Sequence, residues 1–119
     1  MESLTISTVG RFLRNSIIEN FIKNDIEYCP ENHEPFDPDF DIPVKVDNVF
    51  FKVILVVHSI KNSFLCIADY EGGIKDKNII GRVNGVLNQT LINLKYATKV
   101  QWYRPEDEGW LIEIRSSNF

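Results

Sequence analysis

Apolar residues are concentrated in two neighbouring segments of the chain, residues 49–58 and 64–68, with a polar break at 59–63 between them. Both segments are rich in β-branched and aromatic residues and poor in charged ones, a composition typical of strands. We therefore expect an antiparallel hairpin that turns at residues 61 and 62.

The position of this turn determines which side chains share a face of the hairpin. It sets Val57 opposite Cys66 and Leu55 opposite Ala68 on one face. The alternate positions point to the other face and are also apolar. A sheet that is apolar on both faces must be covered on both, by helices, a second subunit or a client polypeptide. The candidate partner-binding residues on the second face are Ile54, Val56, Leu65 and Ile67.

Two further segments show the three- and four-residue apolar spacing of amphipathic helices. The first spans about residues 8–24, where Ser7 or Thr8 is the expected N-cap. The second follows Asp76, a candidate cap, and its apolar stripe runs along residues 79–94.

Two glycines interrupt the second predicted helix. Gly81 and Gly85 lie four residues apart, and each costs about 1 kcal/mol relative to alanine in a helix. Two interpretations stay open: a smooth groove for the close approach of a partner helix or strand, or simple tolerance of glycine on an exposed side.

Three more strands complete the predicted sheet. Residues 42–46 form one strand, and residues 47–48 favour a turn into the central hairpin. Residues 98–103 and 110–114 form a last hairpin. The predicted fold is therefore α+β: an antiparallel sheet of about five strands with two helices, in the order α-β-β-β-α-β-β, within a single domain spanning residues 1–119.

Negative charge is concentrated in one segment of a chain whose formal net charge is −4. Residues 25–41 hold seven carboxylates and no Lys or Arg, and residues 27–41 also hold three prolines, which predicts a long loop. A dense patch of one sign favours a partner of the opposite sign through electrostatic steering. The acidic side chains predicted for such docking are Glu31, Glu34, Asp37 and Asp39.

The remaining composition narrows the class of protein. The sequence contains neither a run of about 20 apolar residues nor a signal-like N-terminal segment, so we expect no membrane span and no secretion. Lys and Arg are scattered rather than gathered in a stripe, which argues against nucleic acid as a partner. Cys29 lies in the acidic loop and Cys66 in a core strand, so we expect no disulfide and assign the chain to the reducing cytoplasm.

No motif predicts a metal site or a catalytic site. The acids of residues 37–41 alternate like those of a calcium loop, but Ile42 and Asn48 stand where the turn glycine and the bidentate glutamate belong. His58 and Cys66 fall on opposite faces of the predicted hairpin, which argues against a shared zinc ion. The two histidines adjoin no nucleophile motif. We therefore predict no cofactor and no metal, and a small enzyme without a recognisable motif is an alternative.

The order of the predicted elements resembles that of the YbjN family and of the related type III secretion chaperones. Residues 42–54 resemble the strand-turn-strand of that family, and residues 83–88 are similar to its Asn-containing second helix. Three features differ: Asn48 stands where the family often has glycine, the acidic segment 27–41 replaces a short strand region, and no closing helix precedes Phe119. The resemblance implies a non-enzymatic, protein-binding role and frequent dimerisation.

Two hypotheses of function follow. The first is a cytoplasmic protein-binding module that shields an apolar segment of a partner, or forms a homodimer, through the second face of the hairpin. The second is an immunity-like inhibitor whose acidic segment 27–41 docks on a basic site of a toxin or nuclease. Neutralising the acids of that segment discriminates between them, because it should weaken an inhibitor and leave a chaperone-like module working.

Overall fold

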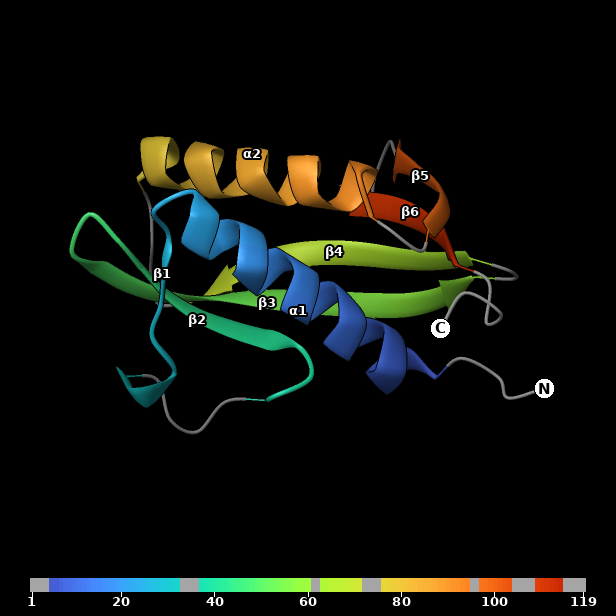
Figure 1. Ribbon diagram of the computed structural model, residues 1–119, viewed down its shortest axis with the longest axis horizontal. Helices are drawn as coiled ribbons and strands as arrows, with labels where there is room; N and C mark the ends of the chain where they lie inside the picture. Colours follow the sequence, from blue (N-terminus) through green and yellow to red (C-terminus); the bar gives the residue numbers. More distant parts are fainter. Residues whose placement is uncertain are drawn as a thin grey trace.

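The computed structural model describes residues 5–32, 37–60, 63–71, 76–94, 97–103 and 109–114. Its elements in chain order are α1 (Ile6–Lys23), β1 (Glu27–Tyr28), the short 3-10 helix η1 (Pro30–Asn32), β2 (Asp41–Val46), β3 (Val49–Ile60), β4 (Ser63–Glu71), α2 (Lys77–Ile92), β5 (Ala97–Tyr103) and β6 (Gly109–Ile114). Figure 1 shows their arrangement. The predicted α+β class is confirmed, and the two-residue strand β1 is added to the predicted order.

All neighbouring strands of the sheet are antiparallel, and their order in space is β1-β2-β3-β4-β6-β5. The long hairpin β3–β4 forms the centre. Its register sets Val57 opposite Cys66 and Leu55 opposite Ala68, as the sequence predicts. The predicted turn residues 61 and 62 lie outside the described part of the chain.

Capping side chains fix where the two helices begin. Asp76 caps α2 as predicted, because its carboxylate accepts two amide hydrogens of the first turn at 2.9 and 3.3 Å. The N-cap of α1 is Thr5 and not the predicted Ser7 or Thr8. The hydroxyl oxygen of Thr5 accepts the amide hydrogen of Thr8 at 3.1 Å, so the helix begins earlier than its apolar spacing indicates.

The turn after β2 agrees with the sequence prediction, and the segment before β2 differs from it. Asp47 and Asn48 both have left-handed φ values, 50° and 67°, and form the predicted two-residue turn between β2 and β3. The segment 27–41 is not a loop throughout, because β1 pairs with the end of β2 and η1 follows it. A two-residue strand is too short to leave an alternating pattern in the sequence.

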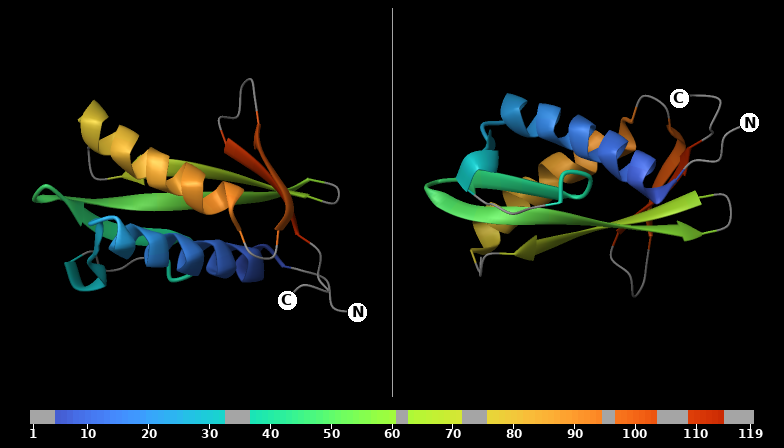
Figure 2. Two further views of the ribbon diagram at one scale, coloured as in Figure 1. Left: turned by 45° about the horizontal axis from the view of Figure 1, so that its top comes forward. Right: turned by 90° about the horizontal axis from the view of Figure 1, so that it is seen from below.

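One hydrophobic core joins the sheet to both helices. Figure 2 shows α1 on one side of the β3–β4 hairpin, with β5 and β6 crossing the end of that hairpin at a steep angle. The indole N–H of Trp110 donates to Oδ1 of Asn88 at 3.0 Å, which ties β6 to α2. The largest fully buried side chains include Trp110, Phe21, Phe51, Leu13 and Ile17.

Glycines occupy contrasting positions in the two helices. A Cβ atom at Gly10 of α1 would overlap the ring of Phe40, so only glycine lets the helix approach the segment before β2 so closely. A Cβ atom at Gly81 or Gly85 of α2 would meet nothing within 4 Å. Both glycines of α2 therefore face open space, which is compatible with each of the two interpretations above.

We expect Gly10→Ala to lower the free energy of unfolding by about 1–3 kcal/mol, because overpacking forces the helix or the Phe40 ring to shift. Gly81→Ala is the matched control. It should raise the free energy of unfolding by up to about 1 kcal/mol, since alanine is the better helix former. Urea denaturation followed by circular dichroism measures both values. Equal effects of the two substitutions would contradict the close contact at Gly10.

Candidate partner-binding surface

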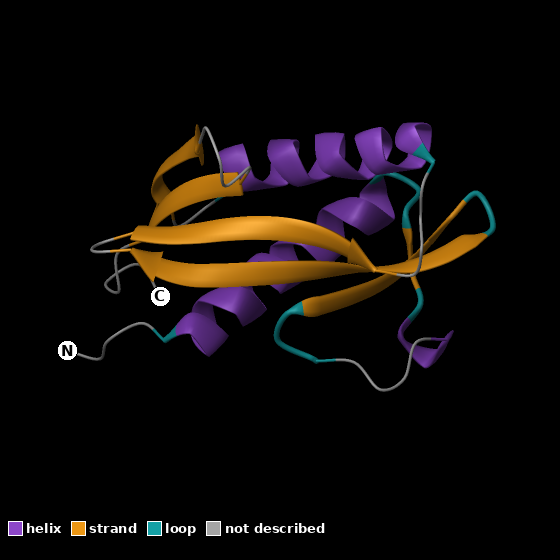
Figure 3. Ribbon diagram, turned by 180° about the vertical axis from the view of Figure 1, so that it is seen from behind, coloured by secondary structure: helices purple, strands orange, loops and turns teal. Residues whose placement is uncertain are grey.

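On β3 and β4, neither of the described helices covers the face of the sheet opposite α1. Figure 3 shows these two strands in front of α1, and neither helix crosses in front of them. The register pairs Val56 with Ile67 and His58 with Leu65. Side chains alternate along a strand, so the four apolar residues predicted to bind a partner do share one face. We call the surface formed by Ile54, Val56, Leu65 and Ile67 the outer face.

The outer face is apolar and more enclosed than a bare patch. Leu65 is only 4 % exposed although it lies outside the main core cluster, whereas the other three residues are half-buried. In the sheet Leu65 lies between His58 of β3 and Leu111 of β6, its register partners on either side. A partner would therefore newly cover the three half-buried residues around Leu65.

Charged side chains lie beside the apolar residues of this face. Lys52 and Glu71 are register partners on β3 and β4, and their Nζ and Oε2 atoms form an ion pair at 3.5 Å. The Nζ atom of Lys45 lies 5.3 Å from the centroid of the Phe50 ring, and Phe50 is 41 % exposed. An apolar centre with a polar rim is the usual anatomy of a protein–protein interface.

Half of one edge of β3 has no neighbouring strand in the described part of the chain. β3 has 12 residues and β2 has 6, so β2 pairs with β3 only as far as Ile54. The amide of Leu55 then donates to the carbonyl of Phe40 at 2.9 Å. Because peptide groups alternate in direction along a strand, the N–H and C=O groups of Val57 and Ser59 point to this same edge. No hydrogen bond joins these four groups to any described residue.

A groove of about 380 Å³ lies beside this open edge of β3. Its lining comes from Ile6 at the start of α1, from Asp37, Phe40 and Asp41 before and at the start of β2, and from residues 54–57 of β3. Since two of those β3 residues also belong to the outer face, the groove connects the open edge with that face.

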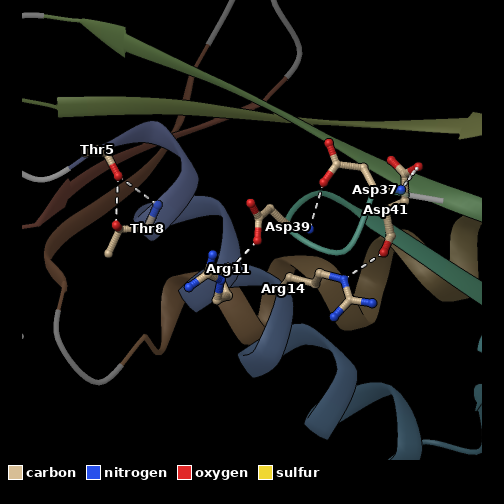
Figure 4. A network of polar contacts seen from close by, with 7 residues as sticks. All are labelled: Thr5, Thr8, Arg11, Arg14, Asp37, Asp39 and Asp41. Atoms are coloured by element: carbon tan, nitrogen blue, oxygen red, sulfur yellow. Dashed lines mark hydrogen bonds and ion pairs between the residues drawn. The ribbon is translucent and has the colours of Figure 1, made fainter.

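Two arginines of α1 hold the acidic turn before β2, as Figure 4 shows. Nε of Arg11 pairs with Oδ1 of Asp39 at 3.0 Å, and Nε of Arg14 donates to the carbonyl of Asp41 at 2.7 Å. Arg14 is 8 % exposed, and its guanidinium also donates to the Tyr28 hydroxyl at 2.6 Å. A nearly buried cation with several hydrogen bonds fixes this turn against the helix.

The acidic residues predicted to dock on a basic partner have different environments. Asp37 accepts the amide hydrogen of Asp39 at 2.8 Å, and Asp41 accepts that of Asp37 at 3.0 Å, so both carboxylates stabilise the turn. Asp39 is already paired with an arginine. Glu31 is exposed on η1, and Glu34 lies outside the described residues. Among the described acids of this predicted set, Asp37 and Asp39 already have hydrogen-bond or ion-pair partners within the chain.

Both cysteines are buried and are free thiols. Burial raises the pKa of Cys66 to about 12, and burial together with the neighbouring Glu27 carboxylate raises the pKa of Cys29 to about 11. His58 lies on the outer face and Cys66 on the opposite one, as predicted. Within the described ranges no three His, Cys, Asp or Glu side chains are grouped so that they could hold a metal ion.

Comparisons with protein-family models, with curated proteins and with solved structures found no match to this chain. None of the helices in the described part of the chain is long and apolar enough to cross a membrane. The function is therefore inferred from the geometry of the outer face and of the open edge.

We expect both thiols to react slowly with a thiol-specific reagent in the native protein at neutral pH, because only the thiolate attacks and each folded-state pKa lies far above neutrality. In denaturant both should react at the rate of an ordinary cysteine. Absorbance of the released chromophore measures the two rates. Fast labelling of native Cys29 or Cys66 would contradict the burial described.

Proposed function

We propose that the protein is a non-enzymatic protein-binding module that binds a polypeptide, either a second copy of itself or a client, on its outer face. One observation carries this proposal. The two helices share a single core with the sheet, and Figure 3 shows neither helix over the outer side of β3 and β4, the side to which the register assigns Val56 and Ile67. Apolar residues gathered on an open sheet face are a frequent basis for association.

The charges around the outer face support binding of a particular partner. An ion pair such as Lys52–Glu71 at the rim contributes little to affinity, because it is partly exposed to solvent. Rim charges do, however, set the orientation of a partner and disfavour wrong ones. The outer face thus combines an apolar centre, which supplies binding energy, with a rim that supplies selectivity.

Two alternatives are less well supported. For an inhibitor that docks its acidic segment, the carboxylates of Asp37 and Asp41 would have to keep their backbone hydrogen bonds while they meet a basic partner, and Asp39 would have to release Arg11. For a small enzyme, neither histidine adds support, because His58 is exposed on the face opposite Cys66 and His33 lies outside the described residues.

The resemblance to the YbjN family and to type III secretion chaperones also supports a protein-binding role. Two helices on an antiparallel sheet are the arrangement that the resemblance implies. The two free thiols, Cys29 and Cys66, support the assignment to a reducing compartment such as the cytoplasm.

The double substitution Val56→Lys with Ile67→Lys tests the outer face. These residues are register partners and both are half-buried. We expect the variant to fold with a loss of at most about 3 kcal/mol, because lysine stems can lie along the surface while the ammonium groups reach water. We expect it to lose self-association or client binding. Circular dichroism reports the fold, and sedimentation velocity reports the association.

Leu55→Lys is the matched control, because Leu55 neighbours Val56 in the same strand but is 2 % exposed and faces the core. It should unfold the protein, since a buried unpaired ammonium costs several kcal/mol. If the double variant also unfolds, the outer face is covered within the protomer and the proposal fails. If the double variant folds and associates like the wild type, the binding surface lies elsewhere.

A further inference from the structure

We propose that a second copy of this chain adds to the sheet along the open edge of β3, antiparallel to it and centred on His58. This inference rests on the proposed function and names its partner and its geometry. The two sheets then join edge to edge about a two-fold axis, and the outer faces of the two copies become continuous.

The backbone groups on this edge are self-complementary. A two-fold axis at His58 sets Val57 of one copy opposite Ser59 of the other. Both residues direct their N–H and C=O groups to the edge, so each of the two Val57–Ser59 pairs exchanges a pair of hydrogen bonds. The pairing therefore satisfies backbone groups that no described residue of the same chain binds.

The side chains match about the same axis. Val56 of each copy lies opposite Ile60 of the other, on the outer face. In the single chain Ile60 is 37 % exposed and Val56 is half-buried, so both gain cover. Two β-branched residues opposite each other pack well on a pleated surface.

Residues 56–60 lack the features that keep natural edge strands apart. Such edges carry lysine, proline, an inward-pointing charge or a bulge. This segment reads Val-Val-His-Ser-Ile, and its pairing with β4 is regular up to Ile60. The segment contains no Asp, Glu, Lys or Arg. A strand without charged residues therefore fits this edge. The same segment of a second copy is such a strand, and its N–H and C=O groups lie opposite those of the first copy.

The small area of this strand pairing limits the stability of the dimer. A stable interface buries about 1,200–2,000 Å² in total, more than one short pair of strands supplies. The groove beside the edge adds apolar area, since Ile6 is 40 % exposed there and Phe40 also lines it. We therefore expect a reversible dimer whose population rises with protein concentration.

Disulfide cross-linking at position 58 tests the register. The two-fold axis sets residue 58 of one copy opposite residue 58 of the other as a non-hydrogen-bonded pair, with Cα atoms about 4.5 Å apart, a distance that a disulfide accepts. We expect His58→Cys to form a covalent dimer under mild oxidation, with the bond mapped to position 58 by mass spectrometry. Cys29 and Cys66 are buried and should not compete.

Three matched variants make the test specific. Ile67→Cys lies on the outer face away from the edge, and under the same conditions it should stay monomeric. Ser59→Pro removes an N–H that no described residue of the single chain binds and that the dimer uses, so it should fold and should reduce cross-linking of His58→Cys by at least about ten-fold. Ser59→Ala keeps that N–H and should leave the cross-linking unchanged.

Each other outcome overturns the edge pairing. Cross-linking of Ile67→Cys without that of His58→Cys would indicate a face-to-face dimer, and the proposed function would then stand. Cross-linking that persists in Ser59→Pro would mean that the edge hydrogen bonds are not used. If neither cysteine variant cross-links and the wild type sediments as a monomer at high concentration, the edge is unpaired. The proposed function then depends on a client, and client binding by the double variant Val56→Lys with Ile67→Lys decides it separately.

Discussion

The pairing of β3 with β4, regular from Lys52–Glu71 to Ile60–Ser63, is the interaction on which the other elements depend. Both strands are longer than the neighbours that flank them. As a result, β2 covers only part of β3, and β6 pairs only with residues 64–66 of β4. The helices fill one side of this long hairpin. The outer face lies on the other side of the hairpin, and the open edge of β3 begins where the shorter β2 stops.

Local signals explain why much of the fold could be predicted from the sequence. A two-residue turn fixes the phase of each strand around it, so the register of Val57 with Cys66 and the shared face of Val56 and Ile67 both follow from residues close in the chain. Asp76 is similarly a local signal for the start of α2, since its carboxylate accepts hydrogen bonds from amides of the first turn.

The remaining features depend on contacts between residues far apart in the sequence. Arg14 is a charged residue of an amphipathic helix, and its contacts with Asp41 and Tyr28 make it nearly buried in the folded chain. The acids of this segment likewise gain structural roles only in the fold, where the carboxylates of Asp37 and Asp41 accept backbone hydrogen bonds within the turn before β2. The open edge of β3 left one trace in the sequence: the apolar run 42–46 is much shorter than the run 49–58 that follows it.

The short junction between β4 and β6 has a consequence for the order in which the molecule folds. The strands β2, β3 and β4 are consecutive, and only two residues separate each from the next, so they can pair with little loss of chain entropy. β6 must instead return across α2 and β5 before Phe64 can meet Ile112. Contacts between distant parts of a chain form slowly. The meander of β2 to β4 should therefore assemble first, with Trp110 closing the core as β6 docks in the last stage.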